Sequence, residues 1–201
     1  MRVKSDARRQ AIVDAATELF REVGFERASM AQISARAGGS KATLYSYFGS
    51  KEELFAAAMV DSMAEQADAM IALLEDPGED LTATFTRFGL AYLQLIGSGQ
   101  CVCSIRTAIS ESSNGELGPV LYRMGPRRGM EEIAEHIERL MAQGRLSKGD
   151  PLLAAMQFKG LLDAGSWEPR LFGAPQEFDD EMAVKAAVRT FLRGYAPEAE
   201  G

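Results

Sequence analysis

The sequence is poor in residues that cross-link a fold or hold a metal ion. Its 201 residues include two cysteines and one histidine. Cys101 and Cys103 stand too close together to join distant parts of the chain, which argues against a disulfide-stabilised scaffold. A metal site at Cys-Val-Cys would need two further ligands, and His136 lies far away in sequence. We expect two small packed residues on a helix, with a redox or metal switch as the alternative, and no cofactor.

Long apolar runs are also missing. No run approaches the roughly 18 to 20 residues that a membrane-spanning helix needs. The basic N-terminus is followed by an apolar stretch that Asp14 and Glu18 interrupt, so no signal peptide is predicted. We therefore expect a cytoplasmic protein that does not contact a membrane.

Positive charge is scarce overall but is concentrated at one end. The formal net charge is −7, yet residues 1–51 hold nine Lys/Arg and five Asp/Glu, a local charge of +4. The remaining residues hold 13 basic and 24 acidic side chains, a charge of −11. Binding to a phosphate backbone depends on the potential within about one Debye length, ~8 Å at physiological salt, so the chain total does not exclude a nucleic-acid partner.

Helical periodicity runs through almost the whole chain, and no clean β alternation appears. We predict an all-α fold of about nine helices, with an N-terminal helix-turn-helix three-helix domain and a helical ligand-binding and dimerisation domain. We place the first domain at residues 1–51 and the second at 52–201. The core motif spans about 29–48, and a support helix continues from 51 to about 70. We expect Asp6 to cap the first helix and Pro126 to kink a later one.

The stretch GGSKATLYSYFGSKEEL, residues 38–54, carries the strongest functional signal. Ser29 and Gln32 form a capping-box pattern, and Ser40 precedes a second short helix after two glycines. Two short helices joined by a Gly-containing turn are typical of a helix-turn-helix, whose second helix enters the major groove of DNA.

The residue types along this motif suit DNA contacts. Lys41 can reach a guanine edge or a phosphate, while Ala42 permits close approach or touches a thymine methyl. Hydroxyls suit phosphate oxygens, and Lys51 opposes its helix dipole unless an anion compensates. The alternative is that the tyrosines pack and the lysines are solvated. The predicted DNA-binding residues are Ser29, Gln32, Ser40, Lys41, Ala42, Thr43, Tyr45, Tyr47 and Lys51.

The string ISARAGGSKATLYSYFGSKEELF resembles the signature of TetR-type transcriptional regulators, with a likeness that covers about residues 7–65. Gly39 departs from it, because this family commonly has an aliphatic residue there; we expect looser packing between the two short helices. The rest of the chain is similar to the AefR-like subgroup in ISESSNGELGPVLYRMGPRR, GRLSKGDPLLAAMQFKGLL and LFG. The resemblance implies a homodimer on a pseudo-palindromic DNA site and a small effector bound among the helices of the body.

Two sets of body residues follow as candidates, although aromatic residues at helical spacing usually form core. The effector-pocket candidates are Phe88, Tyr92, Arg106, Tyr122, Phe158 and Trp167. The dimer-interface candidates are Leu152, Met156, Lys159, Leu162, Met182, Val184, Val188 and Phe191.

The favoured hypothesis is a sequence-specific DNA-binding regulator, a homodimeric repressor that a small molecule releases from its operator. An enzyme is the second hypothesis, but no Ser/His/Asp or Cys/His arrangement and no phosphate-binding glycine loop supports it. An architectural DNA-binding protein without a ligand is the third, and the long body with its own apolar faces argues against it.

Overall fold

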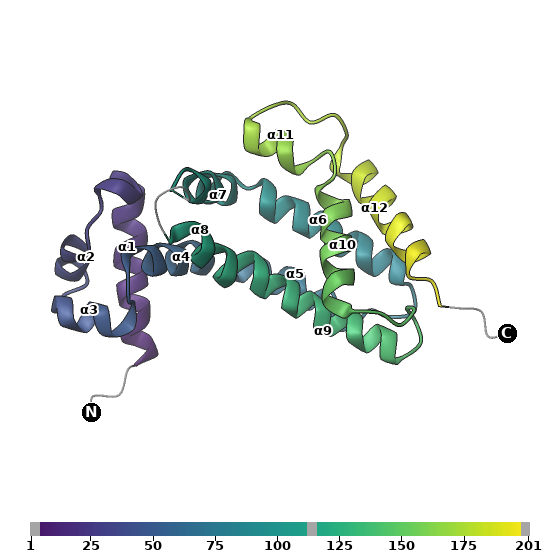
Figure 1. Ribbon diagram of the computed structural model, residues 1–201, viewed down its shortest axis with the longest axis horizontal. Helices are drawn as coiled ribbons and strands as arrows, with labels where there is room; N and C mark the ends of the chain where they lie inside the picture. The colour runs from purple at the N-terminus through teal and green to yellow at the C-terminus, as the bar shows by residue number, and fades with distance from the viewer. Residues whose placement is uncertain (1–4, 112–115, 198–201) are drawn as a thin grey trace. The chain divides into compact units, whose positions relative to one another are not determined.

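The computed structural model describes residues 5–111 and 116–197. Over these residues the fold is all-α, with twelve α-helices and one π-helical turn (Figure 1). The elements are α1 (Asp6–Arg27), α2 (Met30–Arg36), α3 (Lys41–Tyr47), α4 (Lys51–Asp61), α5 (Ala64–Ala72), α6 (Leu81–Gly97), α7 (Gly99–Glu111), α8 (Leu117–Tyr122), η1 (Arg123–Arg127), α9 (Arg128–Ala142), α10 (Pro151–Asp163), α11 (Trp167–Phe172) and α12 (Asp180–Gly194). The all-α prediction is confirmed, and short pieces account for the excess over nine.

One of those pieces corrects a predicted boundary. The support helix, expected to continue to about 70, ends at Asp61, and a new helix, α5, begins at Ala64. A further short helix, α11, begins after Ser166. Pro126 disrupts its helix as predicted: the chain passes through η1, because proline removes a backbone donor and clashes with the preceding turn.

The chain forms two compact units. Unit 1 comprises residues up to Ala64 together with Ser104–Pro126, and unit 2 comprises Glu65–Cys103 together with the residues from Arg127 onward. This division differs from the boundary at 51/52 that the sequence suggested, because part of α7 and all of α8 pack with the N-terminal helices. The functional boundary stays a prediction.

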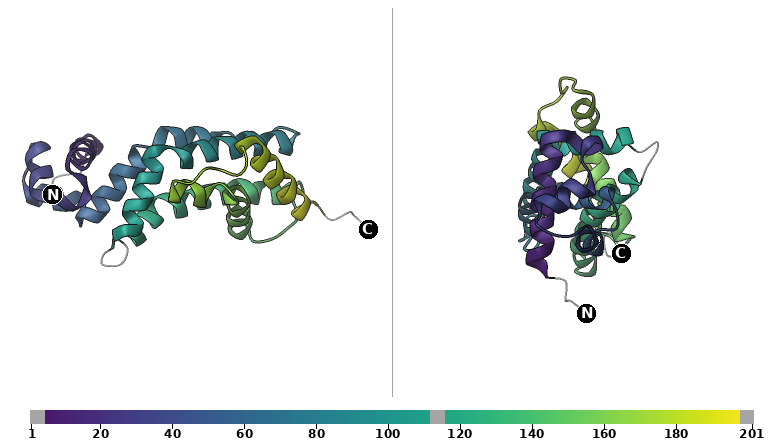
Figure 2. Two further views of the ribbon diagram at one scale, coloured as in Figure 1. Left: turned by 90° about the horizontal axis from the view of Figure 1, so that it is seen from above. Right: turned by 90° about the vertical axis from the view of Figure 1, so that its left-hand side faces the viewer.

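Unit 1 is built around α1, the long purple helix of Figure 2. Its buried side chains include Ile12, Leu19 and Phe20, and α4 and α8 cover that core. Phe20 and Phe25 both meet Phe55 edge to face, with ring centroids 4.9 and 5.0 Å apart. Edge-to-face pairs of this kind stabilise a core beyond the area they bury.

The ends of the N-terminal helices follow local rules. Ser5, rather than the expected Asp6, caps α1, since its side chain accepts from the Arg8 amide. Gly24 has φ 80° and ψ 166°, which lets the chain leave the helical path before its last turn. Glu53 accepts from the Gly49 amide at 2.7 Å, while Ser50 caps α4.

Unit 2 is held by an aromatic core between α6, α10 and α12. Phe85 meets Phe158 edge to face at 5.1 Å, and Phe158 lies 4.8 Å from Phe191. All three rings are 1% exposed. At Gly89 an added Cβ would come within 2.8 Å of Val184 Cγ1 and 2.9 Å of Leu162 Cδ2, so the lack of a side chain there allows the close approach of α6 to both neighbours.

No single helix in the described ranges is long and apolar enough to cross a membrane. In the same ranges, no three His, Cys, Asp or Glu side chains gather where they could hold a metal ion. Cys101 is buried, which raises the pKa of its thiol, whereas Cys103 is exposed.

His136 is buried in unit 2 beside a backbone carbonyl and a cation. Its Nδ1 lies 3.0 Å from the Leu74 carbonyl oxygen, and the Arg139 guanidinium contacts the same nitrogen. Burial, followed by the charge of Arg139, lowers the pKa of His136, although the Leu74 carbonyl, Glu75 and Glu135 act in the opposite direction. The neutral imidazole is therefore the form that the folded chain favours.

This pKa shift predicts that the protein loses stability as the pH falls below 6.5. The unfolded chain takes up the proton first, so stability is complete above the unfolded pKa and declines as the pH falls toward the lower folded pKa. Chemical denaturation between pH 7.5 and 5.5 measures the slope. His136→Gln should flatten the part of the slope nearest pH 6.5; an unaltered profile in that variant would contradict the assignment.

Candidate nucleic-acid interface

The predicted recognition helix exists as α3 and is capped as expected. Ser40 accepts from the Thr43 amide at 3.1 Å, and the two hydroxyls lie 2.9 Å apart. Leu44 is 2% exposed and Phe48, the residue after α3, is also 2% exposed. These two side chains anchor one face of the short helix in the core of unit 1, which directs the opposite face to solvent.

The solvent face of α3 presents the residue types that groove binding needs. Lys41 and Ala42 are exposed in its first turn, and Tyr45 is 51% exposed one turn later. No hydrogen bond or ion pair reaches the Lys41 side chain from the residues that the structure describes. A cation, a small apolar residue and a phenol are thus exposed together on one face of α3.

Tyr47 lies apart from Tyr45, as their spacing requires. Tyr47 is half-buried, and its hydroxyl accepts from the Ser5 backbone amide at 3.1 Å. Of the two tyrosines, Tyr45 is therefore the one whose side chain is available to a partner.

Ser29 and Gln32 complete the capping box at the start of α2. The Gln32 side chain accepts from the Ser29 amide at 3.0 Å, and the Gln32 amide donates to Ser29 Oγ at 3.3 Å. Both side chains therefore fix the helix that precedes α3, and their contact with a phosphate stays a prediction.

Lys51 has a partner that the sequence did not suggest. Its ammonium donates to the Phe25 carbonyl at 2.9 Å, approaches the Glu26 carbonyl at 3.5 Å and lies 4.1 Å from the centroid of the Phe25 ring. The predicted conflict with the dipole of α4 is thus relieved by carbonyl groups of α1, beyond its kink at Gly24. A phosphate contact by Lys51 is a further prediction rather than a requirement.

Two arginines near the motif form hydrogen bonds with other residues of unit 1. Arg36 donates to Glu22 at 2.8 and 2.6 Å, and this hydrogen bond is the main reason why the pKa of Glu22 is lowered. Arg8 donates from Nη1 to the Ala37 carbonyl at 2.9 Å, at the end of α2. Sequence reasoning missed Arg8, since no local pattern links it to a residue 29 positions away.

The predicted effector-pocket residues do not form one group. Phe88, Tyr92 and Phe158 are buried together in unit 2, where the Tyr92 hydroxyl donates to Asp163 Oδ1 at 2.7 Å. Burial, followed by this carboxylate, raises the pKa of Tyr92. Trp167 is half-buried at the start of α11.

Arg106 and Tyr122 are both exposed and belong to unit 1, and their part in an effector pocket stays a prediction. Arg106 borders a shallow cleft of about 380 Å³ against the end of α1.

Some of the predicted dimer-interface residues are buried in the core of unit 2, and others are exposed. Leu162, Val184, Val188 and Phe191 are at most 1% exposed and belong to the core of unit 2, so they cannot form the contact surface. Their helical spacing marked an apolar face correctly, but that face packs inside the chain. Lys159 pairs with Asp163, and Leu152 is half-buried. Met156 and Met182 are 37% and 57% exposed.

Two family models match the chain. Residues 12–58 match the model described as bacterial regulatory proteins, tetR family. Residues 83–197 match the model described as AefR-like transcriptional repressor, C-terminal domain, which covers more than half of the chain. The chain belongs to the TetR family. It is a DNA-binding transcriptional regulator and not an enzyme.

Two curated relatives match only part of the chain. The transcriptional activator FasR of Mycolicibacterium smegmatis is 34% identical over 90 residues, 43% of this chain and 41% of that protein. The regulator BetI of Escherichia coli is 39% identical over 64 residues, 32% of this chain and 33% of that protein. The chain therefore matches less than half the length of either relative.

Solved structures cover nearly the whole chain. A TetR-family regulator from Mesorhizobium loti has a TM-score of 0.76 at 24% identity, covering 97% of this chain and 100% of that one, and shows the fold alone. The flavonoid-responsive regulator FrrA has a TM-score of 0.74 at 28% identity, with the same coverage.

Lys51 is expected to stabilise unit 1 whatever its role toward DNA. Lys51→Ala removes the bond to Phe25 and the contact with its ring, which should lower the free energy of unfolding by about 1 kcal/mol. Urea denaturation measures the loss. Lys148→Ala, at an exposed lysine in the loop before α10, is the control and should change stability little.

The salt dependence of DNA binding then tests the second role of Lys51. A phosphate contact would make Lys51→Ala reduce the slope of log affinity against log salt by about 1. An unchanged slope would leave Lys51 with the structural role only.

Proposed function

We propose that this TetR-family regulator is a homodimeric repressor, which leaves a pseudo-palindromic operator when a small molecule binds in unit 2. The observation that carries its DNA-binding part is the solvent face of α3, with exposed Lys41, Ala42 and Tyr45 above buried Leu44. The match of residues 83–197 to a model of AefR-like repressors supports repression. The regulator acts in the cytoplasm, where it meets the chromosome.

Each α3 reads one half-site in this proposal. The first turn of a recognition helix reaches deepest into the major groove, and there Lys41 and Ala42 contact base edges. The hydroxyls of Thr43 and Tyr45 bind phosphate oxygens and fix the register. Unit 2 has an acidic surface that does not attract DNA, which restricts the contact to the basic N-terminal residues.

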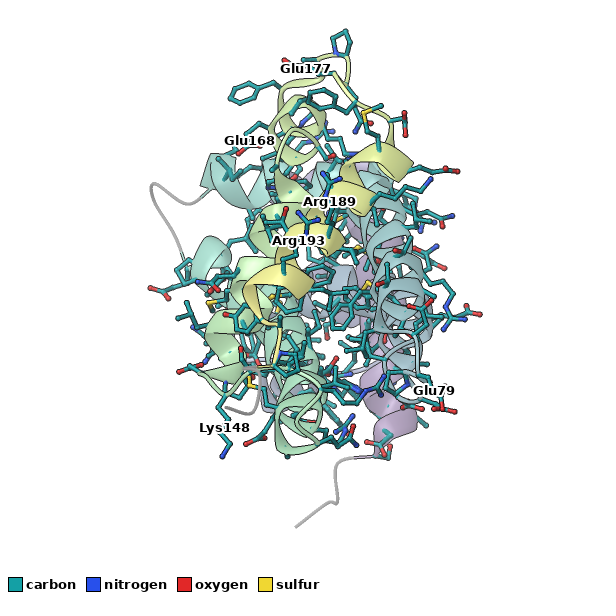
Figure 3. All side chains as sticks on the ribbon, turned by 90° about the vertical axis from the view of Figure 1, so that its right-hand side faces the viewer. Glu79, Lys148, Glu168, Glu177, Arg189 and Arg193 are labelled. Carbon is teal, nitrogen blue, oxygen red and sulfur yellow. The ribbon has the colours of Figure 1, made fainter. Side chains whose placement is uncertain are left out.

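Homodimerisation is supported by the outer faces of α10 and α12. Leu153, Met156 and Met182 are 53%, 37% and 57% exposed. Because α10 and α12 are in contact, these side chains expose apolar area on neighbouring helices, which is typical of an interaction surface. Arg189 and Arg193 point outward from α12, and Glu168 and Glu177 lie on α11 and the loop that follows it (Figure 3). A two-fold axis brings each such patch onto its own copy, so opposite charges on one surface can pair across it.

The proposed effector site is centred on the Tyr92 hydroxyl, a polar group in the aromatic core of unit 2. The Tyr92 hydroxyl donates to Asp163, its ring stacks on Phe88 at 6.5 Å between centroids, and Phe158 packs against the other ring, that of Phe88, at 6.0 Å. FrrA, a similar structure, is named for its response to flavonoids, which combine aromatic rings with hydroxyls. A ligand of that class could stack on the phenylalanines and exchange hydrogen bonds with Tyr92 and Asp163.

Release from DNA follows from the need to engage two half-sites together. A dimer gains affinity from its second α3 only while the spacing of the two helices fits the operator. A ligand that changes the spacing removes that gain, so a small displacement in each subunit is sufficient.

Operator selection from genomic DNA tests the proposal as a whole. The recovered fragments should contain a two-fold symmetric element, and the affinity for it should exceed that for scrambled DNA. Flavonoids added to the complex should release the fragment, and deletion of the gene should raise transcription from the adjoining promoter. Reduced transcription after deletion would make the protein an activator, as FasR is named.

Base preference should depend on Lys41 and Ala42. Lys41→Ala or Ala42→Val changes a group at the base edges, so one or two operator positions should lose about 1–3 kcal/mol of discrimination each. Competition binding against single-base operator variants measures this. Equal weakening on every variant would make Lys41 a phosphate contact.

The dimer surface is tested by placing charge on it. Met156→Glu and Met182→Glu put carboxylates in the proposed contact, which should convert the dimer to a monomer and abolish operator binding. Sedimentation analysis gives the oligomeric state. Ala142→Glu, at an exposed alanine at the end of α9, is the control; dissociation of that variant too would contradict the assigned surface.

A further inference from the structure

Gly39, in the turn between α2 and α3, has no room for a side chain. A Cβ added there would lie 2.1 Å from Nη2 of Arg8, closer than Cβ atoms approach in proteins, and 3.3 Å from its Cζ, so the guanidinium would have to leave its place. The backbone conformation is not the reason, because the left-handed φ of this turn belongs to Gly38, at 68°. What Gly39 provides is space, and the guanidinium of Arg8 fills it.

Arg8 makes a directed bond in that space. Its Nη1 donates to the Ala37 carbonyl at 2.9 Å, and Ala37 is the residue that ends α2. On the other side, the hydroxyl of buried Ser34 donates to the Gly39 carbonyl at 2.8 Å. The turn that leads into α3 is therefore held from two sides by side chains of α1 and α2.

The first turn of α1 also reaches the far end of α3. The Ser5 amide donates to the Tyr47 hydroxyl at 3.1 Å, and Arg9 lies over the Phe48 ring, 5.3 Å from its centroid. Residues 5–9 thus contact the segments before and after a helix of seven residues. A displacement of either contact would change the direction in which α3 presents Lys41.

We propose that Arg8 is a positioning residue for DNA recognition, which acts through the turn at Gly39 and not through a contact with DNA. The inference rests on the proposed role of α3 in base recognition. Arg8 fixes the turn by its bond to Ala37, and the missing side chain of Gly39 is what allows the guanidinium to lie there. Arg8 and Gly39 therefore act together to fix the turn before α3, although 31 positions separate them in the sequence.

A double-mutant cycle tests the coupling between the two positions. Arg8→Ala removes the guanidinium, and Gly39→Ala adds only the Cβ that collides with it. Each single variant should bind the selected operator about tenfold more weakly, the scale of one charge-assisted hydrogen bond. The double variant should bind about as well as either single variant, because the added Cβ no longer meets anything. A loss of about a hundredfold in the double variant would overturn the proposal.

The salt dependence separates positioning from a direct phosphate contact. Arg8→Ala should leave the slope of log affinity against log salt unchanged, and its affinity for scrambled DNA should match that of Arg21→Ala, a charge-matched control on the same helix. A slope lower by about 1 would make Arg8 a phosphate ligand and would overturn the positioning role.

Hydrogen exchange without DNA keeps this inference distinct from the proposed function. The Gly39 amide donates to the Ser34 carbonyl at 3.1 Å, and the Leu44 amide donates to the Ser40 carbonyl at 3.1 Å. Both should exchange about tenfold faster in Arg8→Ala and in Gly39→Ala, while the amides of α4 keep their protection. Unchanged exchange at both amides would overturn the role of Arg8. A wild-type chain that shows this response but does not prefer its selected operator would instead refute the proposed function.

Discussion

The recognition helix is too short to stand alone, and that constraint shapes the rest of unit 1. An isolated helix of fewer than about 12 residues is marginal in water, whereas α3 has seven. Its stability must come from its neighbours: the Ser40 cap, the burial of Leu44 and Phe48, and the contacts from α1 at its two ends. The stability of α3 therefore depends on residues outside its solvent face.

The division of charge has a related consequence. A chain with a net charge of −7 is repelled by DNA everywhere except near the +4 of its first 51 residues. Within those residues Arg36 is paired with Glu22, and both Arg8 and Lys51 donate to backbone carbonyls. The unpaired cation on α3 is Lys41, among the residues that the structure describes.

Local rules predicted the features that involve residues close in sequence. The capping box of Ser29 and Gln32, the cap at Ser40 and the disruption at Pro126 follow from groups within four positions of one another. Helical spacing also located the apolar faces. It could not say what covers them, and Val188, expected at a dimer interface, lies in the core instead.

The contacts that the sequence did not reveal are long side chains that cross between elements. Lys51 reaches a carbonyl 26 positions earlier, and Arg8 one 29 positions later. Such contacts leave no periodic trace, because a lysine or an arginine at a helix end is equally compatible with solvent. The filling of the space at Gly39 could not be predicted for this reason, since a distant guanidinium occupies the place of the missing side chain.

The same arrangement of arginine and glycine recurs in unit 2. An added Cβ at Gly97, the last residue of α6, would lie 2.8 Å from Nε of Arg170. Arg170 also donates to both carboxylate oxygens of Asp180, at 2.8 and 2.9 Å, and to the Ser166 carbonyl at 3.2 Å. Gly39 in the turn after α2 and Gly97 at the end of α6 both leave the backbone uncovered, and in each case a guanidinium occupies the space. A planar group with five donors suits this task, because it can lie flat on the bare chain and still bond at its edges. At such a junction the glycine is there because an arginine packs against its Cα. The φ angles of Gly39 and Gly97, which are not in the left-handed region, would not reveal this role.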